Sequence, residues 1–303
     1  MKVLLFGKDG QVGWELQRAL APLGEVLALG IRSADFHADF AEPDGLAETV
    51  RAVRPDVIVN AAAYTAVDRA ESEPDLARSI NATAPGVLAQ EAARSGSVLV
   101  HYSTDYVFDG SGTEPRDEEA PTGPLGVYGR TKLEGEERIR QSGCTCAILR
   151  TSWVYAARGN NFARTMLRLA AEQDRLKVVD DQVGAPTSAE LLADLTAHVV
   201  RILVDNPRLG GIYHVVPTGY TSWHGYACFL IERARELGFP VKVAVKDIEP
   251  VPTAAYPTPA TRPLNSRLST GKFAAAFGLM LPPWQTGVQR LLRDVLDQSE
   301  WIP

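Results

Sequence analysis

Short apolar runs alternate with helical patterns throughout the amino-terminal half of the chain. The apolar runs, each four or five residues long, lie at residues 3–6, 25–29, 56–60 and 98–102. Helical patterns follow at residues 14–20, in a stretch that ends near residue 55, and at residues 77–95. Strands that are apolar on both sides and separated by helices are typical of a parallel sheet covered on both faces. The pattern predicts an α/β fold with a Rossmann-type doubly wound parallel sheet.

The pattern changes after about residue 153. Helical stretches at residues 162–172 and 190–203 alternate with short strands at 177–180 and 211–216, and residues 250–263 are dense in proline, which predicts an extended loop. We therefore predict a Rossmann domain over residues 1–153. A smaller α/β domain is predicted over residues 154–303, with some segments returning to the first domain. The smaller domain is expected to bind the substrate, because ligands lie at the carboxyl edge of such sheets.

Composition and charge exclude several classes of protein. Of the 303 residues, 45% are hydrophobic and 22% are charged, which is ordinary for a globular protein and excludes disorder. The net charge of −6 has the wrong sign for attracting nucleic acid, so no nucleic-acid partner is expected. No apolar stretch reaches the roughly 18 residues of a membrane span, so no membrane partner is expected, and the apolar run at the start is too short for a signal peptide.

The cysteines indicate a reducing compartment. Cys144, Cys146 and Cys228 are an odd number and include no C-x-x-C pair, which argues against a disulfide framework or a zinc site. We expect a cytoplasmic protein in which Cys144 and Cys146 pack beside a strand.

Glycines follow the first predicted strand directly and precede the first helix. Gly7, Gly10 and Gly13 are spaced G-x-x-G-x-x-G, and such glycines let a helix amino terminus approach a pyrophosphate closely. The spacing alone also fits a plain tight turn. Its position between a strand and a helix favours dinucleotide binding and makes residues 1–153 an NAD(P)-binding domain.

The end of the second strand bears on the choice of dinucleotide. An NAD enzyme usually carries an acidic residue there, which binds the ribose 2′-hydroxyl. This chain has Gly30, followed by Arg32 and Ser33, and the acidic residue nearest the adenine end is Asp39. A cation and a hydroxyl suit a 2′-phosphate, which favours NADPH over NADH. Arg32 could equally be a solvated surface arginine.

A tyrosine and a lysine stand four residues apart at the start of a helical pattern. Tyr128 and Lys132 should lie on one helix face, where the ammonium is expected to lower the pKa of the phenol toward the working range of a general acid. The alternative is an ordinary surface pair. Thr104 follows the fourth predicted strand and could hydrogen-bond both the tyrosine and a carbonyl oxygen. A phosphate loop, a hydroxyl at a strand end and Y-x-x-x-K, in this order, resemble the extended short-chain dehydrogenases/reductases.

Longer strings narrow the resemblance. They are GKDGQVGWE (7–15), NAAAYTAVD (60–68), YSTDYVF (102–108), RTSWVY (150–155), GNNF (159–162), DQVGAPTSAE (181–190) and VPTAAYPTPATRPLNSRL (251–268). Together they resemble the dTDP-4-dehydrorhamnose reductase family over residues 7 to about 294. The proline-rich string and D-Q-x-G-x-P-T are the most specific of them.

The resemblance implies roles for individual residues. Tyr128 would donate a proton to the C4 oxygen of dTDP-4-dehydro-L-rhamnose, Lys132 would tune it and hold the nicotinamide ribose, and Thr104 would polarise the carbonyl. A hydride from NAD(P)H would complete the reduction to dTDP-L-rhamnose, a precursor of cell-surface polysaccharide such as the O-antigen of lipopolysaccharide. Implied cofactor contacts are Gly10, Gln11 and Val12 at the pyrophosphate, Asp39 and Phe40 at the adenosine, and Ala63, Tyr64, Thr65 and Tyr102 near the inner ribose. Implied contacts of the sugar nucleotide are Asp105 and Trp153.

The resemblance also implies a structural Mg²⁺ between the two subunits of a homodimer. The matching carboxylates are Glu15, Glu190 and Asp294, and three solvated surface carboxylates are the alternative. Hydride transfer with a Tyr–Lys pair needs no Lewis acid, so the ion would not be catalytic.

Other residues of the matching strings have two possible roles. Arg262 and Arg267 could bind a diphosphate or lie on the surface of the loop. Asn160 and Asn161 could contact substrate or cap the following helix. The aromatic residues at 223, 226 and 229 have helical spacing and are expected in the core.

Two other functions remain open. The substrate could be another nucleotide-linked 4-keto-6-deoxy sugar, because the nucleoside contacts cannot be seen in the sequence. The chain could also be a non-catalytic regulatory subunit that binds a dinucleotide. A subunit freed from catalysis could lose the tyrosine, lysine or threonine, whereas Thr104, Tyr128 and Lys132 are all present.

Overall fold

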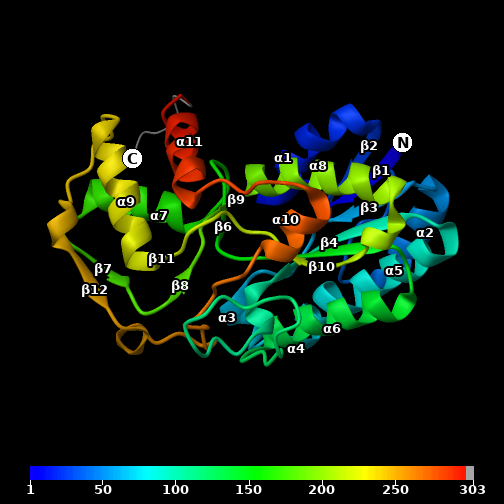
Figure 1. Ribbon diagram of the computed structural model, residues 1–303, viewed down its shortest axis with the longest axis horizontal. Coiled ribbons are helices and arrows are strands. Elements are labelled where there is room, and N and C mark those ends of the chain that lie inside the picture. Colours follow the sequence, from blue (N-terminus) through cyan, green and yellow to red (C-terminus); the bar gives the residue numbers. More distant parts are fainter. Residues whose placement is uncertain (298–303) are drawn as a thin grey trace.

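A six-stranded parallel sheet forms the middle layer of the larger part of the protein, on the right in Figure 1. The computed structural model describes residues 1–297. The strand order is β10-β5-β4-β3-β1-β2, and every neighbouring pair is parallel. The strands are β1 (Lys2–Phe6), β2 (Glu25–Leu29), β3 (Val57–Asn60), β4 (Val98–Thr104), β5 (Cys146–Thr151) and β10 (Gly211–His214). The predicted fold class is confirmed.

Helices cover both faces of this sheet (Figure 1). One face carries α1 (Gln11–Leu20) and α8 (Ala189–Asp205); the other carries α2 (Pro43–Val53), α5 (Ala84–Ser95) and α6 (Val127–Ser142). Side chains alternate between the faces of a strand, so Val3 packs in one core with Leu16 of α1. Its neighbour Leu4 packs in the other core with Leu46 and Leu88 of α2 and α5. Burial on both faces explains why β1 is a continuous apolar run.

The chain order reverses between β1 and β3. β2 lies on one side of β1, whereas β3, β4 and β5 follow on the other. At such a switch point the loops leave the strand ends in opposite directions and open a crevice for a ligand. The loop after Phe6 and the loop after Asn60 border this crevice.

Two predicted elements differ in detail. The helix expected at residues 77–95 is divided into α4 (Pro74–Arg78), a π-helical turn η2 (Ser79–Thr83) and α5. In the turn, the Asn81 side chain accepts from the Tyr64 backbone N–H at 2.9 Å and donates to the Thr131 hydroxyl at 3.2 Å. A π-helical turn has one residue more than an α-helical turn, and these two bonds hold Asn81 of this wider turn against residues far away in the sequence. β4 also continues two residues beyond its predicted end, so Thr104 is its last residue and does not follow it.

The carboxyl-terminal half has a core of its own. A parallel pair, β7 (Leu176–Val179) and β12 (Ile248–Val251), packs with α7 (Phe162–Glu172), α9 (Trp223–Glu236) and α11 (Trp284–Asp297). β10 and α8 belong instead to the first sheet and its covering layer, and α10 (Gly271–Phe277) packs there as well. The exact boundary at residue 153 stays a prediction.

Short elements complete the description. They are α3 (Val67–Ala70), β6 (Val154–Tyr155), β8 (Val183–Gly184), β9 (Thr187–Ser188), β11 (Thr221–Ser222) and the 3₁₀ turns η1 (Ala21–Leu23), η3 (Asp105–Val107), η4 (Pro207–Leu209), η5 (Val245–Asp247) and η6 (Thr253–Ala255). No helix among residues 1–297 has the length and apolarity needed to cross a membrane.

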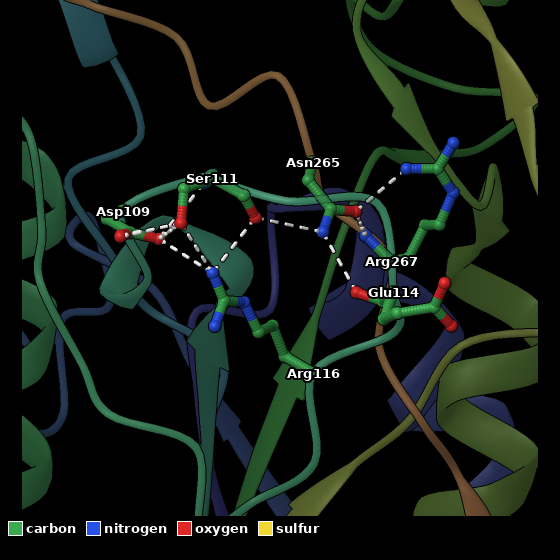
Figure 2. Close-up of polar contacts among 6 residues, drawn as sticks. All are labelled: Asp109, Ser111, Glu114, Arg116, Asn265 and Arg267. Atoms are coloured by element: carbon green, nitrogen blue, oxygen red, sulfur yellow. Dashed lines mark hydrogen bonds and ion pairs between the residues drawn. The ribbon is translucent and has the colours of Figure 1, made fainter.

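The proline-rich segment is largely the extended loop predicted, but β12 and η6 occupy its first part. Farther on, polar contacts tie it to the first half of the chain (Figure 2). Asn265 donates to the carbonyl oxygen of Glu114 at 2.9 Å, and Arg116 holds Asp109 and the Ser111 carbonyl at 3.0 and 2.9 Å. These bonds fix two long loops beside the carboxyl edge of the sheet.

The aromatic residues of α9 lie as expected. Tyr226 is fully buried in the second core, and Trp223 and Phe229 pack against that core while partly exposed. Cys146 is buried at the start of β5, next to Cys144, and both are free thiols.

Candidate active site

Two adjoining cavities lie at the carboxyl ends of the strands. The larger has a volume of about 510 Å³ and is lined by the phosphate loop, the ends of β4 and β5 and the start of α6. The smaller, of about 270 Å³, lies at the ends of β1 and β2. Both are lined by Asp9, Gly10, Ala61 and Ala63, so they form one continuous crevice at the switch point. An elongated ligand such as a dinucleotide fits this arrangement.

Most of the predicted site residues line the crevice. Those in the larger cavity are Gly10, Gln11, Val12, Ala63, Thr65, Tyr102, Thr104, Asp105, Tyr128, Lys132 and Trp153. Those in the smaller cavity are Gly7, Gly10, Gly30, Asp39, Phe40 and Ala63. Residues that were far apart in the sequence are thus brought together.

Three predicted cofactor residues do not line it. Gly13 lets α1 approach β1, because a β-carbon there would lie 1.9 Å from the Gly7 carbonyl oxygen. The Tyr64 phenol bonds to Glu73. Arg32 is exposed on the surface.

The prediction of NADPH rests on a sequence without a carboxylate at the end of β2, whereas the fold brings one there from the phosphate loop. A β-carbon built on Gly30 would lie 2.1 Å from Oδ2 of Asp9. The two residues are far apart in the sequence, so their contact could not be predicted from it.

Tyr128 lies in the first turn of α6. The carboxylate of Glu71 accepts a hydrogen bond from the Val127 backbone N–H at 2.7 Å, which satisfies a free donor at this helix start. The Tyr106 ring packs edge-on against the Tyr128 ring, with centroids 5.4 Å apart. Burial raises the pKa of Tyr128 to about 12, although hydrogen bonding with Thr104 lowers it. The phenol is therefore protonated at neutral pH, as a proton donor must be.

The prediction that Lys132 lowers the pKa of Tyr128 is wrong for this structure. The Lys132 ammonium donates to the Tyr102 carbonyl oxygen at 2.6 Å and lies 3.3 Å from Nε2 of His101. Burial lowers the pKa of Lys132 to about 8, against a smaller opposing effect of Glu136. The printed contacts of the ammonium are thus with Tyr102 and His101 of β4, and no hydrogen bond joins it to the Tyr128 phenol among the described residues.

His101 and Asn60 are buried polar residues that line neither cavity but contact each other, and His101 also contacts Lys132; sequence reasoning missed them. Asn60 Oδ1 accepts from the Ala62 backbone N–H at 3.0 Å, so the amide nitrogen must face Nδ1 of His101, 3.0 Å away. The proton of a neutral imidazole then lies on Nε2, and because an ammonium has no acceptor, the 3.3 Å contact of Nε2 with Lys132 is not a hydrogen bond. Burial, and then the Lys132 charge, hold the pKa of His101 well below its usual value. A histidine inside an apolar strand was the available signal.

Asp105 has one carboxylate oxygen without a geometrically formed hydrogen bond, although the Ser266 hydroxyl lies close enough to the carboxylate to oppose the rise of its pKa. Its side chain is 2% exposed, Oδ1 accepts from the Thr104 hydroxyl at 3.2 Å, and Oδ2 has no hydrogen-bond partner among the described residues. Burial raises the pKa of Asp105 to about 6. An unpartnered acceptor that lines the cavity suits a ligand hydroxyl.

Trp153 closes the cavity on the side of the second core. Its indole stacks on Trp223, with ring centroids 3.6 Å apart and planes 12° from parallel. Its backbone has φ +50, a conformation that a bulky residue rarely adopts and that is found at ligand sites. Gly184 allows this, since a β-carbon there would come within 2.9 Å of the Trp153 ring. Trp223, which packs against the second core, thereby positions the Trp153 ring at the larger cavity.

Comparisons with known proteins agree with this geometry. The family described as the RmlD substrate binding domain matches residues 1–296. The dTDP-4-dehydrorhamnose reductase of Escherichia coli strain K12 is 56% identical over 295 residues, which cover 97% of this chain and 98% of that protein. The chain belongs to the dTDP-4-dehydrorhamnose reductase family. The resemblance noted in the sequence is confirmed.

Solved structures of reductases in this family have the same fold. The dTDP-4-dehydrorhamnose reductase of Clostridium acetobutylicum is 36% identical, with a TM-score of 0.86 and coverage of 98% of this chain and 100% of that chain. The enzyme of Bacillus anthracis, solved in complex with NADP, is 33% identical, with a TM-score of 0.85 and coverage of 97% and 99%.

Three polar residues of the remaining matching strings have partners within the protein. Arg262 pairs with Asp68 at 2.7 Å, and Arg267 donates to the Asn265 side chain at 3.0 Å (Figure 2). Neither arginine lines the larger cavity. Asn161 caps α7 by accepting from the Arg164 backbone N–H at 3.1 Å, and it also donates to Gln11 of the phosphate loop at 2.9 Å. The capping role is confirmed for Asn161.

The three carboxylates of the metal prediction line one small cavity of about 30 Å³. Glu190 is paired with Arg290 at 2.6 Å and Glu15 with Arg18 at 3.5 Å. Among residues 1–297, no group of three or more His, Cys, Asp or Glu side chains is arranged to hold a metal ion. The residues do not form a metal site within one chain, and a site between two chains stays a prediction.

A buried ion pair fastens the reductase helix α6 to the sheet. Arg150 of β5 forms a two-pronged bond to Glu136, at 2.9 and 2.7 Å, and the Ser103 hydroxyl of β4 donates to the same carboxylate at 2.5 Å. Both charged side chains are at most 3% exposed. Glu136 lies on the same helix as Lys132 and Tyr128, so this network sets the depth at which both enter the cavity.

Glu136→Gln is expected to lower the free energy of unfolding by about 3 to 5 kcal/mol, because it leaves the Arg150 charge buried without its partner. The measurement is urea unfolding followed by circular dichroism. Glu137→Gln, one residue along on the exposed face of α6, is the matched control and should change stability by less than about 0.5 kcal/mol. Equal stability of the two variants would contradict a structural role for the pair.

Proposed function

We propose that this protein reduces the C4 carbonyl of dTDP-4-dehydro-L-rhamnose to the alcohol of dTDP-L-rhamnose, with NADPH as the reductant. The observation that carries the proposal is the convergence of Thr104, Tyr128 and Lys132 in one cavity beside the phosphate loop. The relatives named as dTDP-4-dehydrorhamnose reductases support the choice of substrate.

Each residue of the cavity has a task in this reduction. The Tyr128 phenol donates its proton to the C4 oxygen, and the Thr104 hydroxyl, which donates to Asp105 in this structure, rotates to donate its single proton to the same oxygen. Lys132 holds the inner ribose by donating to its hydroxyls, which positions the nicotinamide for hydride transfer. The free oxygen of Asp105 accepts from a sugar hydroxyl, and Trp153 packs against the sugar nucleotide. A bound NADPH supplies the hydride.

The crevice provides the groups that a dinucleotide needs. The first turn of α1, which follows the N-cap Gly10, presents the backbone N–H groups of Gln11 and Val12 to a pyrophosphate, whereas the Gly10 N–H donates to the Gly7 carbonyl oxygen at 3.0 Å. The smaller cavity, with Asp39 and Phe40, suits the adenosine. The NADP complex of the Bacillus anthracis enzyme supports NADPH for this chain. NADH is the second candidate.

Absorbance of the reduced cofactor at the nicotinamide band, followed with purified protein and dTDP-4-dehydro-L-rhamnose, tests the proposal. Substrate-dependent loss of absorbance is the expected result, and other nucleotide-linked 4-keto-6-deoxy sugars are assayed beside it. Faster turnover of one of those would replace the substrate. Tight binding of cofactor without turnover of any sugar would favour a non-catalytic subunit and refute the reductase proposal.

Removal of divalent cations is expected to leave kcat unchanged within about twofold, because hydroxyl donors already hold the C4 oxygen and no Lewis acid is needed. The assay compares protein dialysed against EDTA with protein supplied with Mg²⁺. A loss of about tenfold or more that Mg²⁺ restores would contradict this mechanism. A Mg²⁺-dependent change in oligomeric state alone would support the structural ion between subunits at Glu15, Glu190 and Asp294.

The cellular setting is also part of the proposal. We place the protein in the cytoplasm, as a homodimer without nucleic-acid or membrane partners, where it supplies rhamnose for cell-surface polysaccharide such as O-antigen. The free thiols at Cys144, Cys146 and Cys228 support a reducing compartment.

A further inference from the structure

The phosphate loop is fastened to the end of β2. The backbone N–H groups of Gly7 and Lys8 both donate to the carbonyl oxygen of Leu29, at 2.9 and 3.2 Å. Leu29 is the last residue of β2, and Gly30 follows it. The next residue of the loop, Asp9, is therefore held beside the position where Rossmann folds usually carry an acidic side chain.

The carboxylate of Asp9 fills the space of the missing side chain. A β-carbon built on Gly30 would lie 2.1 Å from Oδ2 of Asp9 and 3.1 Å from its Cγ. A larger residue at position 30 and the present position of Asp9 exclude each other. Gly30 is thus the residue that admits the Asp9 carboxylate to the strand end.

Asp9 faces the crevice with free acceptors. It lines both cavities, and the smaller one also contains Gly30, Asp39 and Phe40. Asp9 is exposed and has no hydrogen bond or ion pair with the described residues. Its oxygens are available to a ligand where the two cavities meet.

The residues expected to bind a 2′-phosphate lie elsewhere. Arg32 does not line the smaller cavity. The Ser33 hydroxyl oxygen accepts from the Gly30 backbone N–H at 3.0 Å and so serves the turn after β2. Asp9 brings its carboxylate against Gly30, whereas the neighbouring Lys8 contacts the same place through its aliphatic Cγ, 3.5 Å from a β-carbon built there.

We propose that Asp9 determines the choice between the two nicotinamide cofactors. Its carboxylate accepts a hydrogen bond from the 2′-hydroxyl of the adenosine ribose in NADH and repels the 2′-phosphate of NADPH. The acidic group that other Rossmann folds carry at the strand end comes here from the phosphate loop. The inference rests on the proposed function, because it concerns the cofactor of that reduction, and it makes NADH a usable reductant beside NADPH.

The test compares kcat/KM for NADPH and NADH in the wild type and in Asp9→Asn. The ratio of kcat/KM for NADPH to kcat/KM for NADH is expected to rise by about tenfold in this variant, because the negative charge of Asp9 no longer repels the 2′-phosphate of NADPH. Asp35→Asn, an exposed aspartate in the turn after β2 that lines neither cavity, is the matched control and should leave the ratio unchanged. Adding Gly30→Asp to Asp9→Asn should return the ratio toward the wild-type value, because it restores a carboxylate to the same place.

Binding separates this inference from the proposed reaction. Kd values for NADPH and NADH, measured by fluorescence of the reduced nicotinamide, should change in the same ratio even if no sugar is turned over. An unchanged Kd ratio in Asp9→Asn overturns the role of Asp9, whatever the activity. An equal loss for both cofactors also overturns it, since Asp9 would then only support the loop. If the protein binds neither NADPH nor NADH, this inference and the proposed function are refuted together.

Discussion

Tyr128→Phe is expected to lower kcat for the reduction of dTDP-4-dehydro-L-rhamnose by about 10³-fold, while the Kd for NADPH stays near the wild-type value. The phenol is protonated at neutral pH, because burial raises its pKa to about 12. It can therefore give a proton to the C4 oxygen, and a phenyl ring of almost the same shape cannot. Stopped-flow measurement of cofactor oxidation with saturating substrate gives kcat directly.

The control for this variant is Tyr256→Phe. Tyr256 is 62% exposed in the proline-rich segment and lines neither cavity, so its loss of a hydroxyl should leave kcat unchanged. A Tyr128→Phe protein that retained more than about a tenth of wild-type kcat would assign the proton to another group. Asp105, with a pKa of about 6, would then be the first residue to test.

Lys132→Met is expected to lower kcat by about 10²-fold and to weaken cofactor binding. Methionine fills most of the volume of the lysine side chain but carries no charge beside the cavity and no donor for a ribose hydroxyl. The variant also removes the bond to the Tyr102 carbonyl oxygen. Lys246→Met, an exposed lysine with no ion pair among the described residues, should behave as the wild type.

The pH dependence of kcat/KM for NADPH is an independent test of whether the charge of Lys132 is needed. Burial lowers its pKa to about 8, so the ammonium is present below pH 8 and is lost as the pH rises through that value. The value of kcat/KM for NADPH, which reports the free enzyme, should fall across the same range. The alkaline fall should be absent in Lys132→Met. Its persistence in that variant would show that another group titrates.

Apolar patterning predicted the frame of the molecule well. The run at residues 25–29 is β2 itself, and the runs at residues 3–6 and 56–60 each lie within one residue of an observed strand at both ends. These strands are buried on both faces, so nearly every side chain in them must be apolar. The helix at residues 77–95 was predicted less well, because its π-helical turn depends on bonds from Asn81 to residues far away in the sequence.

The identities of the site residues could also be predicted, but not their partners. Tyr128, Lys132 and Thr104 lie in one cavity as expected. Their spacing did not show that Lys132 bonds to Tyr102 and faces His101, nor that burial raises the pKa of the phenol. Those properties depend on the depth of α6 against the sheet, which the buried pair of Glu136 and Arg150 helps to set.

The cofactor prediction illustrates the same limit at the other end of the crevice. The sequence shows Gly30 at a position where a carboxylate is usual, and it separates Asp9 from Gly30 by twenty residues. Only the paired ends of β1 and β2 bring them together. Local motifs therefore identified the phosphate loop and the end of β2. The contact between Asp9 and Gly30 could be seen only in the folded chain.

Transfer of deuterium from the cofactor tests the central claim most directly. NADPH carrying deuterium at both C4 positions of the nicotinamide is incubated with the protein and dTDP-4-dehydro-L-rhamnose, and the product is examined by NMR. The predicted result is one deuterium at C4 of the sugar in dTDP-L-rhamnose. A product without deuterium, or with deuterium at another carbon, would contradict a hydride transfer to the C4 carbonyl.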